Sequence, residues 1–381
     1  MPHATEYPRT DFPEDLECHP LLVVDFAKIE AGDEAEIDTL YKACTTIGFF
    51  YLKNFGFEEV IEPMFEMGQA TFDLPNEELM GFEQGDRGMS AGYKRAGANN
   101  VDAKGNLDTI AFINVAKDDA LAYPKVVQRT YPRCVVERMD TVTRFVRQSD
   151  NTLQALMTAL EPRLGLSKGT LAALHVSGSE SRCILKPAPG DRNYMPEGTG
   201  EDGNPAAAIG AHTDFGVRFL PVHLALPWIF PTLSCVSMLH GRGCGGLQVL
   251  PPGTSTWQNI RPLPGHAVCN VGDTLSVYSG NILKSNIHRV VPPPAPQNEH
   301  PRWSLVYFSR PGFDNPLRPL SDKSELIKAH AENDAAMQAL PKDATAGQWY
   351  KRRIALQRVA NRKGPETWAQ SRGTEHTPTA N

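Results

Sequence analysis

Gly210-Ala211-His212-Thr213-Asp214-Phe215-Gly216 is the stretch around which the rest of this sequence is organised. Its pattern predicts a β-strand, so His212 and Asp214, two positions apart, leave the same face. A second imidazole lies further along, in Lys284-Ser285-Asn286-Ile287-His288-Arg289-Val290. Two imidazoles and one carboxylate, with other coordination positions left open, are the protein ligands typical of a non-haem Fe(II) site. The pattern therefore predicts that His212, Asp214 and His288 bind one metal ion.

The composition is that of a soluble, globular protein. The 381 residues are 41% hydrophobic and 22% charged, which allows one large domain with a sizeable core. The formal charge of −6 includes no long block of one sign, so the sequence shows no nucleic-acid-binding surface. We expect a small-molecule substrate rather than a nucleic acid or a membrane.

The cysteines and the apolar runs indicate a cytoplasmic location. The cysteine count is odd and no pair is spaced as CxxC, which argues against a disulfide framework or a structural zinc site; the seven are Cys18, Cys44, Cys134, Cys183, Cys235, Cys244 and Cys269. The polar, acidic first 17 residues do not resemble a secretory signal. The longest apolar run, residues 219–236, contains three prolines and is short for a membrane span.

The predicted secondary structure changes along the chain from mixed helices and strands to mainly short strands. The first half alternates strands with amphipathic helices: strands at 21–26 and 48–54, and helices at 35–46, 57–74, from 76, 135–164 and 166–174. From Arg182 the pattern becomes a series of short strands separated by Gly and Pro, at 183–185, 208–214, 236–239, 247–250, 267–271, 274–279, 290–291 and 304–309. Such a series predicts a sandwich or a double-sheet barrel. Two further helices are expected at 326–337 and 348–358.

These elements suggest four regions. They are a loose tail at 1–18, a helical and stranded N-terminal region at 19–180, a β-rich core at 181–315, and C-terminal helices with a tail at 316–381. Residues 85–105 form a long connection rich in Gly, Asn and Lys, which is either a functional loop or simply flexible.

Several motifs together resemble the Fe(II)/2-oxoglutarate-dependent dioxygenase superfamily, in the branch that contains isopenicillin N synthase, flavonol synthase and gibberellin oxidases. They are His212-Thr213-Asp214, Gly245-Gly246-Leu247-Gln248-Val249, Asn270-Val271-Gly272-Asp273, Lys284-Ser285, His288-Arg289-Val290 and Arg302-Trp303-Ser304. The early stretches 48–54 and 72–75 agree with the N-terminal region of that branch. The resemblance covers roughly residues 20–315.

The resemblance implies a mixed α+β fold, a double-stranded β-helix (jelly roll) core with helices packed around it. It implies that His212, Asp214 and His288 bind Fe(II), leaving room for 2-oxoglutarate and O₂. Arg302 would hold the distal carboxylate of 2-oxoglutarate, a task that suits a planar guanidinium group, and Ser304 would donate a hydrogen bond to it. The reaction would be hydroxylation, desaturation or ring formation on a small organic molecule, with succinate and CO₂ as co-products.

The sequence departs from the family pattern before the first metal ligand. The branch has a Tyr-Pro-Pro element there, whose tyrosine contacts 2-oxoglutarate, whereas this chain reads Leu185-Lys186-Pro187-Ala188-Pro189. Lys186 or Tyr194 are the candidates to replace that tyrosine. The departure leaves open an oxidase like isopenicillin N synthase, which uses the same triad without 2-oxoglutarate. The atypical segment 217–234 leaves open a non-catalytic jelly-roll binding protein.

Residues 217–234 interrupt the family pattern directly after Gly216. Removing these eighteen residues joins Phe215-Gly216 to Cys235 and restores the usual sequence pattern of the family. We hypothesise that the segment is the translation of a retained short intron, since it is a whole number of codons and Val217-Arg218 can be encoded by a splice-donor sequence. The competing interpretation is an apolar flap or partner-binding patch. A transcript that runs directly from Gly216 to Cys235 would support the intron.

The sequence does not identify the substrate. Tyr93, Phe112 and Phe308 are candidates for the pocket wall because they are aromatic and lie near motif positions, although a place in the ordinary core is the more common fate of such residues.

Overall fold

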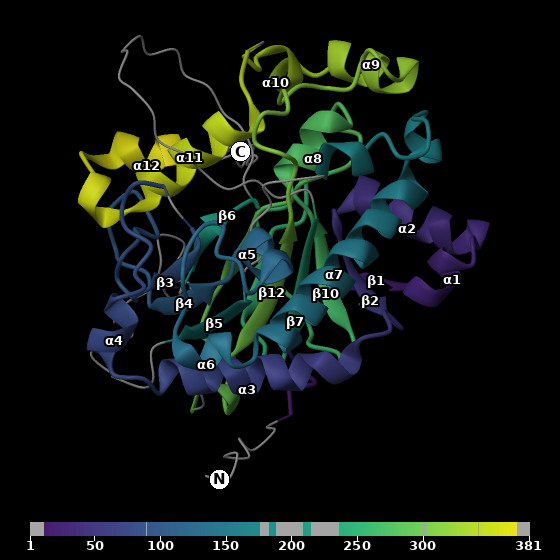
Figure 1. Cartoon of the computed structure of the whole chain (residues 1–381). Coiled ribbons are helices and arrows are strands. Elements are labelled where there is room, and N and C mark those ends of the chain that lie inside the picture. The colour runs from purple at the N-terminus through teal and green to yellow at the C-terminus, as the bar shows by residue number, and fades with distance from the viewer. Residues whose placement is uncertain are drawn as a thin grey trace.

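The computed structural model describes residues 11–88, 90–175, 183–187, 209–214, 236–299, 302–341 and 343–371, with only the course of the backbone for 183–187. Two β-sheets form the centre of these residues, and helices surround them (Figure 1). The larger sheet has eight strands, in the order β1 (Leu22–Asp25), β2 (Phe49–Lys53), β10 (Ala267–Val271), β7 (Val236–Gly241), β12 (Ser304–Ser309), β5 (Cys183–Pro187), β4 (Ile110–Asn114) and β3 (Gly92–Lys94). The smaller sheet has four, in the order β6 (Ile209–His212), β11 (His288–Val290), β8 (Leu247–Val249) and β9 (Gln258–Asn259).

This arrangement confirms the expected jelly-roll core within a mixed α+β fold. All described strand pairs are antiparallel except β1 with β2. The larger sheet crosses the expected boundary at residue 180, because β2 pairs with β10 and β4 pairs with β5. Strands from the N-terminal region thus widen the core sheet instead of forming a separate unit.

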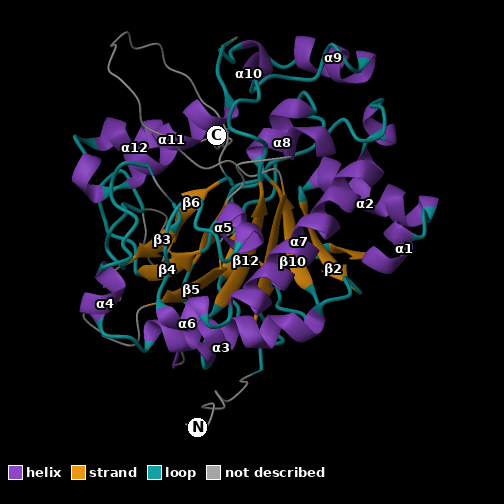
Figure 2. Ribbon diagram, viewed as in Figure 1, coloured by secondary structure: helices purple, strands orange, loops and turns teal. Residues whose placement is uncertain are grey.

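The helices cover the outer face of the larger sheet and one end of the molecule (Figure 2). Their bounds are α1 (Phe26–Glu30), α2 (Glu34–Thr46), α3 (Ile61–Phe72), α4 (Asn76–Met80), α5 (Lys117–Ala122), α6 (Arg133–Val136), α7 (Met139–Leu160), α8 (Asp273–Tyr278), α9 (Glu325–Glu332), α10 (Ala335–Gln338), α11 (Ala346–Gln357) and α12 (Pro365–Ser371). None of the described helices has the length and apolarity needed to cross a membrane.

Helix α7 carries the main apolar contact with the larger sheet. Its predicted inward positions recur at three and four residues, and Val142, Phe145 and Leu153 are all fully buried. They belong to one large core cluster that also contains Leu305 and Tyr307 of β12. Each such side chain contributes about 1.5–3 kcal/mol by leaving water. The helix thereby fixes the back of the strand that begins at Ser304.

Two predicted elements are wrong. The strand expected at 274–279 is helix α8, whose six residues are all buried. In a short apolar run that is buried on every side, apolar and polar residues do not alternate, so the sequence pattern cannot distinguish a strand from a helix. The helix expected at 166–174 is reduced to a 3₁₀ turn, Ala172–His175, because Gly165 and Gly169 both adopt positive φ, which ends helical structure.

Residues 12–14, within the expected loose tail at 1–18, contact the core. Phe12 is 9% exposed, and the guanidinium of Arg261 stacks over its ring at 5.0 Å. The same guanidinium donates to the backbone carbonyls of Pro13 and Glu14. Residues 12–14 are therefore attached to the core by one aromatic ring and two backbone carbonyls. The polar composition of this part of the sequence does not reveal the contact.

Candidate metal centre

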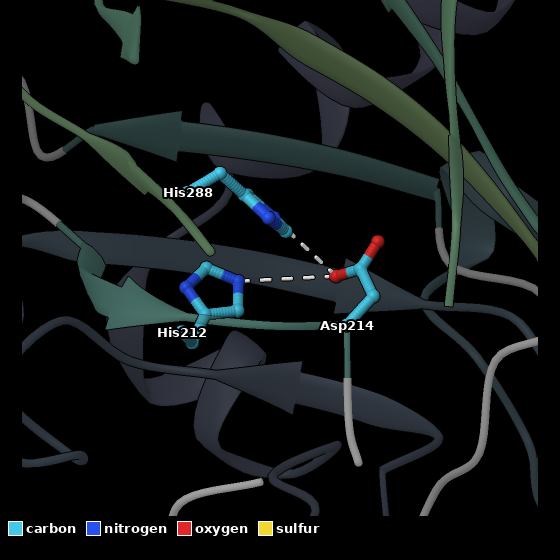
Figure 3. Close-up of side chains that lie close together, drawn as sticks. All are labelled: His212, Asp214 and His288. Carbon is cyan, nitrogen blue, oxygen red and sulfur yellow. Dashed lines mark ion pairs between the residues drawn. The ribbon is translucent and has the colours of Figure 1, made fainter. Parts of the chain in front are cut away.

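Two neighbouring strands of the smaller sheet hold the two histidines. Strands β6 and β11 are antiparallel, and His212 lies directly opposite His288. Their ring centroids are 4.3 Å apart. Asp214 follows β6 after one residue, so its side chain returns to the face of His212. The three side chains converge in Figure 3, as the spacing predicts.

The geometry leaves three ligand atoms facing one another. Nε2 of His212 and Nε2 of His288 lie 3.8 Å and 3.5 Å from Oδ1 of Asp214, and the three atoms all lie within 4.8 Å of one another. Each ring contacts a backbone carbonyl with Nδ1, Gly210 at 2.8 Å and Asn286 at 3.2 Å. A carbonyl can only accept, so Nδ1 carries the proton and Nε2 keeps its lone pair for a metal ion.

Asp214 is oriented by two hydrogen bonds from the larger sheet. The hydroxyl of Ser237 and the amide of Asn270 each donate to Oδ2 at 2.6 Å. Ser237 on β7 pairs with Asn270 on β10, so both side chains reach the carboxylate from one face. With Oδ2 occupied, Oδ1 remains for the imidazoles. Asp214 thereby connects the two sheets, and the donors fix its rotamer as outer-shell partners of metal ligands do.

The charges of the triad interact strongly. Burial by itself would raise the pKa of Asp214, but His288 and His212 hold it well below its ordinary value. Burial and the neighbouring His288 lower the pKa of His212 to about 3. Burial also disfavours the charged form of His288, but the carboxylate of Asp214 outweighs it and raises the pKa above 6.5. His212 is thus a neutral imidazole, Asp214 is an anion, and His288 is an imidazole that exchanges its proton for a metal ion. Together they make a site that fits a divalent cation.

A hydrogen-bonded connection leads from the triad to the C-terminal helices. Thr213, between His212 and Asp214, donates to Oδ2 of Asp273 at 2.8 Å. Nη1 of Arg353 on α11 lies 3.5 Å from the same oxygen, and its Nε donates to the carbonyl of Ser371 at the end of α12. Arg353 and Asp273 are almost fully buried. The C-terminal helices therefore help to hold the strand segment that carries the ligands.

Arg302 and Ser304 are brought together as predicted. Nη1 of Arg302 donates to Oγ of Ser304 at 2.6 Å, and Nε donates to the carbonyl of Gly245 at 2.8 Å. Arg302 is only 7% exposed, and burial lowers its pKa. No described residue offers it a carboxylate. A buried guanidinium without a protein anion is a site for the carboxylate of a ligand.

One cavity joins the triad to Arg302. It is lined from both sheets and from the C-terminal helices by Phe49, Gln84, Asn99, Asn100, Val101, Asp108, Ile110, Phe112, Ile209, Gly210, His212, Asp214, Ser237, Leu239, Leu247, Val268, Asn270, His288, Val290, Arg302, Ser304, Val306, Phe308, Ile354, Gln357 and Trp368. Phe112 and Phe308, two of the aromatic candidates, are among them. Tyr93 is not; it is buried in a separate cluster, 6.2 Å from the ring of Phe72.

Part of the long polar connection forms a wall of this cavity. The backbone N–H of Asn100 donates to the carbonyl of Gln357 at the end of α11, and that of Val359 donates to Ala98. A Cβ on Gly210 would lie 1.9 Å from the carbonyl oxygen of Val101, so the glycine allows the loop to approach β6 closely. Within the connection 85–105, Asn99, Asn100 and Val101 line the cavity, and whether the connection is functional or simply flexible stays open.

Three sequence predictions fall outside what the structure describes. They are the side chain of Lys186, Tyr194 and the atypical segment 217–234. The replacement for the missing tyrosine and the nature of that segment therefore stay hypotheses.

Sequence reasoning missed the supporting residues around the triad. Asn270 and Asp273 lie in a motif that carried the family resemblance, but no role was assigned to either. Ser237 lies outside the motifs that carried the resemblance, and only the pairing register of β7 with β10 places it beside Asn270. The available signal was the pair of polar residues on otherwise apolar strands, because a buried polar group needs a partner.

Two family models match the chain. Residues 21–135 match the N-terminal region described as non-haem dioxygenase in morphine synthesis, and residues 232–311 match the 2OG-Fe(II) oxygenase superfamily. Similar curated proteins include a homoarginine-6-hydroxylase of Glycine max, 28% identical over 74% of this chain and 80% of its own. A 2-oxoglutarate-dependent dioxygenase of Aspergillus fumigatus is 25% identical over 89% of this chain and 86% of its own.

Solved structures share the fold. A full-length Neurospora crassa protein, crystallised with alpha-KG and thymine, superposes with a TM-score of 0.66 at 21% identity, covering 88% of this chain and 96% of that one. JOX2, crystallised with 2OG, Fe and JA, gives 0.63 at 16% identity over 98% and 95%. With both halves of the chain matched in order, the protein belongs to the 2OG-Fe(II) oxygenase superfamily and is a 2-oxoglutarate-dependent dioxygenase.

Proposed function

We propose that His212, Asp214 and His288 bind the Fe(II) of this dioxygenase, and that Arg302 and Ser304 hold the distal carboxylate of 2-oxoglutarate. The observation that carries the proposal is the shared cavity, which contains a preorganised triad and a buried guanidinium that has no anion among the described residues. The ligand atoms fit Fe(II), which accepts imidazole and carboxylate on one face.

The protein groups have distinct tasks in the proposed reaction. Bound iron supplies activation of O₂ for the oxidative decarboxylation of 2-oxoglutarate to succinate and CO₂. Ser237 and Asn270 keep Oδ1 of Asp214 pointed at the metal position. Arg302 fixes the co-substrate through a charge-assisted contact, and Ser304 fixes the orientation of the guanidinium. The apolar walls around Phe112 and Phe308 exclude water from the reacting centre.

The proposed substrate is a small organic molecule that undergoes hydroxylation, desaturation or ring formation. Relatives support this class, since one is named for the hydroxylation of homoarginine and a structural neighbour was crystallised with thymine. The named relatives are dioxygenases that use 2-oxoglutarate, which makes an oxidase without this co-substrate the weaker alternative. The cytoplasmic location stays a prediction.

Binding of 2-oxoglutarate to the Mn(II)-loaded protein tests the assignment of Arg302. Calorimetry should give at least tenfold weaker binding for Arg302→Met, since a charge-assisted pair is lost. Ser304→Ala should show a smaller loss. The matched control is Arg242→Met, which removes a partly exposed arginine that pairs with Glu62 outside the cavity. Equal affinity in Arg302→Met and the wild type would contradict the assignment.

A further inference from the structure

The cavity contains more polar groups than the metal and 2-oxoglutarate require. The triad and Arg302 account for all but one of the ionisable residues that line it among those described. The remaining one is Asp108, whose Oδ2 pairs with Lys94 while Oδ1 accepts from the backbone N–H of Asn99. Because this carboxylate is already neutralised, the rest of the described lining offers no net charge to a substrate.

Amide side chains form the polar part of that lining. Gln84 and Asn100 are each 6% exposed, and Asn99 is partly buried. Among the residues that the structure describes, the oxygens Oε1 of Gln84, Oδ1 of Asn99 and Oδ1 of Asn100 have no hydrogen-bond partner. In Asn100 the orientation is fixed, since Nδ2 donates to the carbonyl of Gln357 at 3.3 Å. A buried acceptor left without a partner costs about 1–3 kcal/mol, which a ligand donor would recover.

These amides are held close to the metal-binding strand. Asn99 and Asn100 directly precede Val101, the residue whose carbonyl contacts Gly210 on β6. Ile110 and Phe112, two residues apart on β4, line the same cavity, and Asp108 lies just before that strand. An apolar, partly aromatic wall therefore lies beside the amides.

We propose that Gln84, Asn99 and Asn100 form a subsite for the polar edge of an uncharged substrate that carries an amide, lactam or imide group. The inference rests on the proposed function, because it places that substrate in the cavity of the metal centre. Amide side chains both donate and accept, so they pair with a group that does the same. A carboxylate or an ammonium group would find no free counter-charge among the described residues of this subsite, which is costly in a buried position.

Matched probes test the proposal on the full chain loaded with Mn(II), a redox-inert substitute for Fe(II), and 2-oxoglutarate. Calorimetry would compare thymine with 1,3-dimethylthymine, and benzamide with benzoate. We expect thymine and benzamide to bind, and each altered partner to bind at least about threefold more weakly, since one lost hydrogen bond is worth about three- to tenfold in affinity. Failure of both amide probes to bind, or equal or tighter binding of the altered partners, would overturn the proposal.

Variants locate the effect in the named residues. Gln84→Met and Asn99→Leu should each weaken thymine binding about three- to tenfold while 2-oxoglutarate binding stays within about twofold of the wild type, which shows a folded site. Gln148→Met is the matched control, because Gln148 also has a buried oxygen without a partner but lies outside the cavity lining. Unchanged thymine affinity in both cavity variants would refute the subsite. Loss of Mn(II) or 2-oxoglutarate binding in the wild type would instead refute the proposed function on which it rests.

Discussion

The hydrogen bonds to Oδ2 of Asp214 give the sharpest prediction about the metal centre. Ser237→Ala and Asn270→Ala each remove one 2.6 Å donor from the carboxylate. A hydrogen bond to a charged group contributes about 1.5–3 kcal/mol. Loss of an outer-shell partner weakens metal binding by about 10–100-fold, and tenfold corresponds to about 1.4 kcal/mol. The two magnitudes agree, so we expect each variant to bind metal about 10–100-fold more weakly.

Anaerobic calorimetry with Fe(II), repeated with Mn(II), measures the effect directly. Asn106→Ala is the matched control, because Asn106 makes a comparable 2.5 Å amide contact with the carboxylate of Asp102 but does not line the cavity. Thermal unfolding of the metal-free variants shows whether each one folds. Wild-type metal affinity in both Ser237→Ala and Asn270→Ala would refute the idea that these donors orient the carboxylate.

Three further predictions follow from the same contacts. Gly210→Ala should lower the free energy of unfolding by about 1–3 kcal/mol, because its Cβ would lie 1.9 Å from the carbonyl of Val101; an unchanged urea midpoint would contradict this close approach. Arg353→Met should destabilise the fold by about 3 kcal/mol or more, since it leaves buried Asp273 without that guanidinium; Arg353→Lys should fall between, and equal midpoints for all three proteins would argue against the connection. Protons compete with metal at His288, whose pKa is raised above 6.5, so calorimetric metal affinity should fall as the pH is lowered through that pKa; a constant affinity between about pH 6 and 8 would be the contrary result.

The pH dependence of the metal-free fold has two opposing parts. The raised pKa of His288 stabilises the fold below its unfolded pKa, and this contribution is lost as the pH rises through the folded value. The pKa of His212, lowered to about 3, acts in the other direction, because the unfolded chain takes up the proton first as the pH falls below about 6.5. Metal binding removes the first contribution by replacing the proton on His288.

Local patterns in the sequence predicted the His212–Asp214 pair because its geometry is local, whereas His288 joins it only through the pairing of β11 with β6. His212 and Asp214 share a strand face through their spacing alone, and the long apolar repeat of α7 needs no tertiary information. Arg302 and Ser304, also two residues apart, meet for the same reason. The jelly roll itself was inferred from the family resemblance and from the series of short strands.

Several missed features depend on contacts that are distant in sequence. Ser237 reaches Asp214 only because β7 pairs with β10. Strands β3 and β4 were not predicted because β3 lies within the polar connection and β4 follows it. These strands are held in the sheet by the pairing of β3 with β4 and of β4 with β5. The buried segment Asp273–Tyr278 was assigned to the wrong class, since burial on all sides removes the alternation that identifies a strand.

The ratio of succinate formed to O₂ consumed tests the central claim most directly. The purified full chain would be supplied with Fe(II) and 2-oxoglutarate, alone and with a panel of small neutral and charged metabolites, and compared with His212→Ala. We predict one succinate per O₂, with a rate that rises when a substrate is present and is abolished in the variant. Substrate-dependent O₂ consumption without succinate, or undiminished turnover in His212→Ala, would contradict the account.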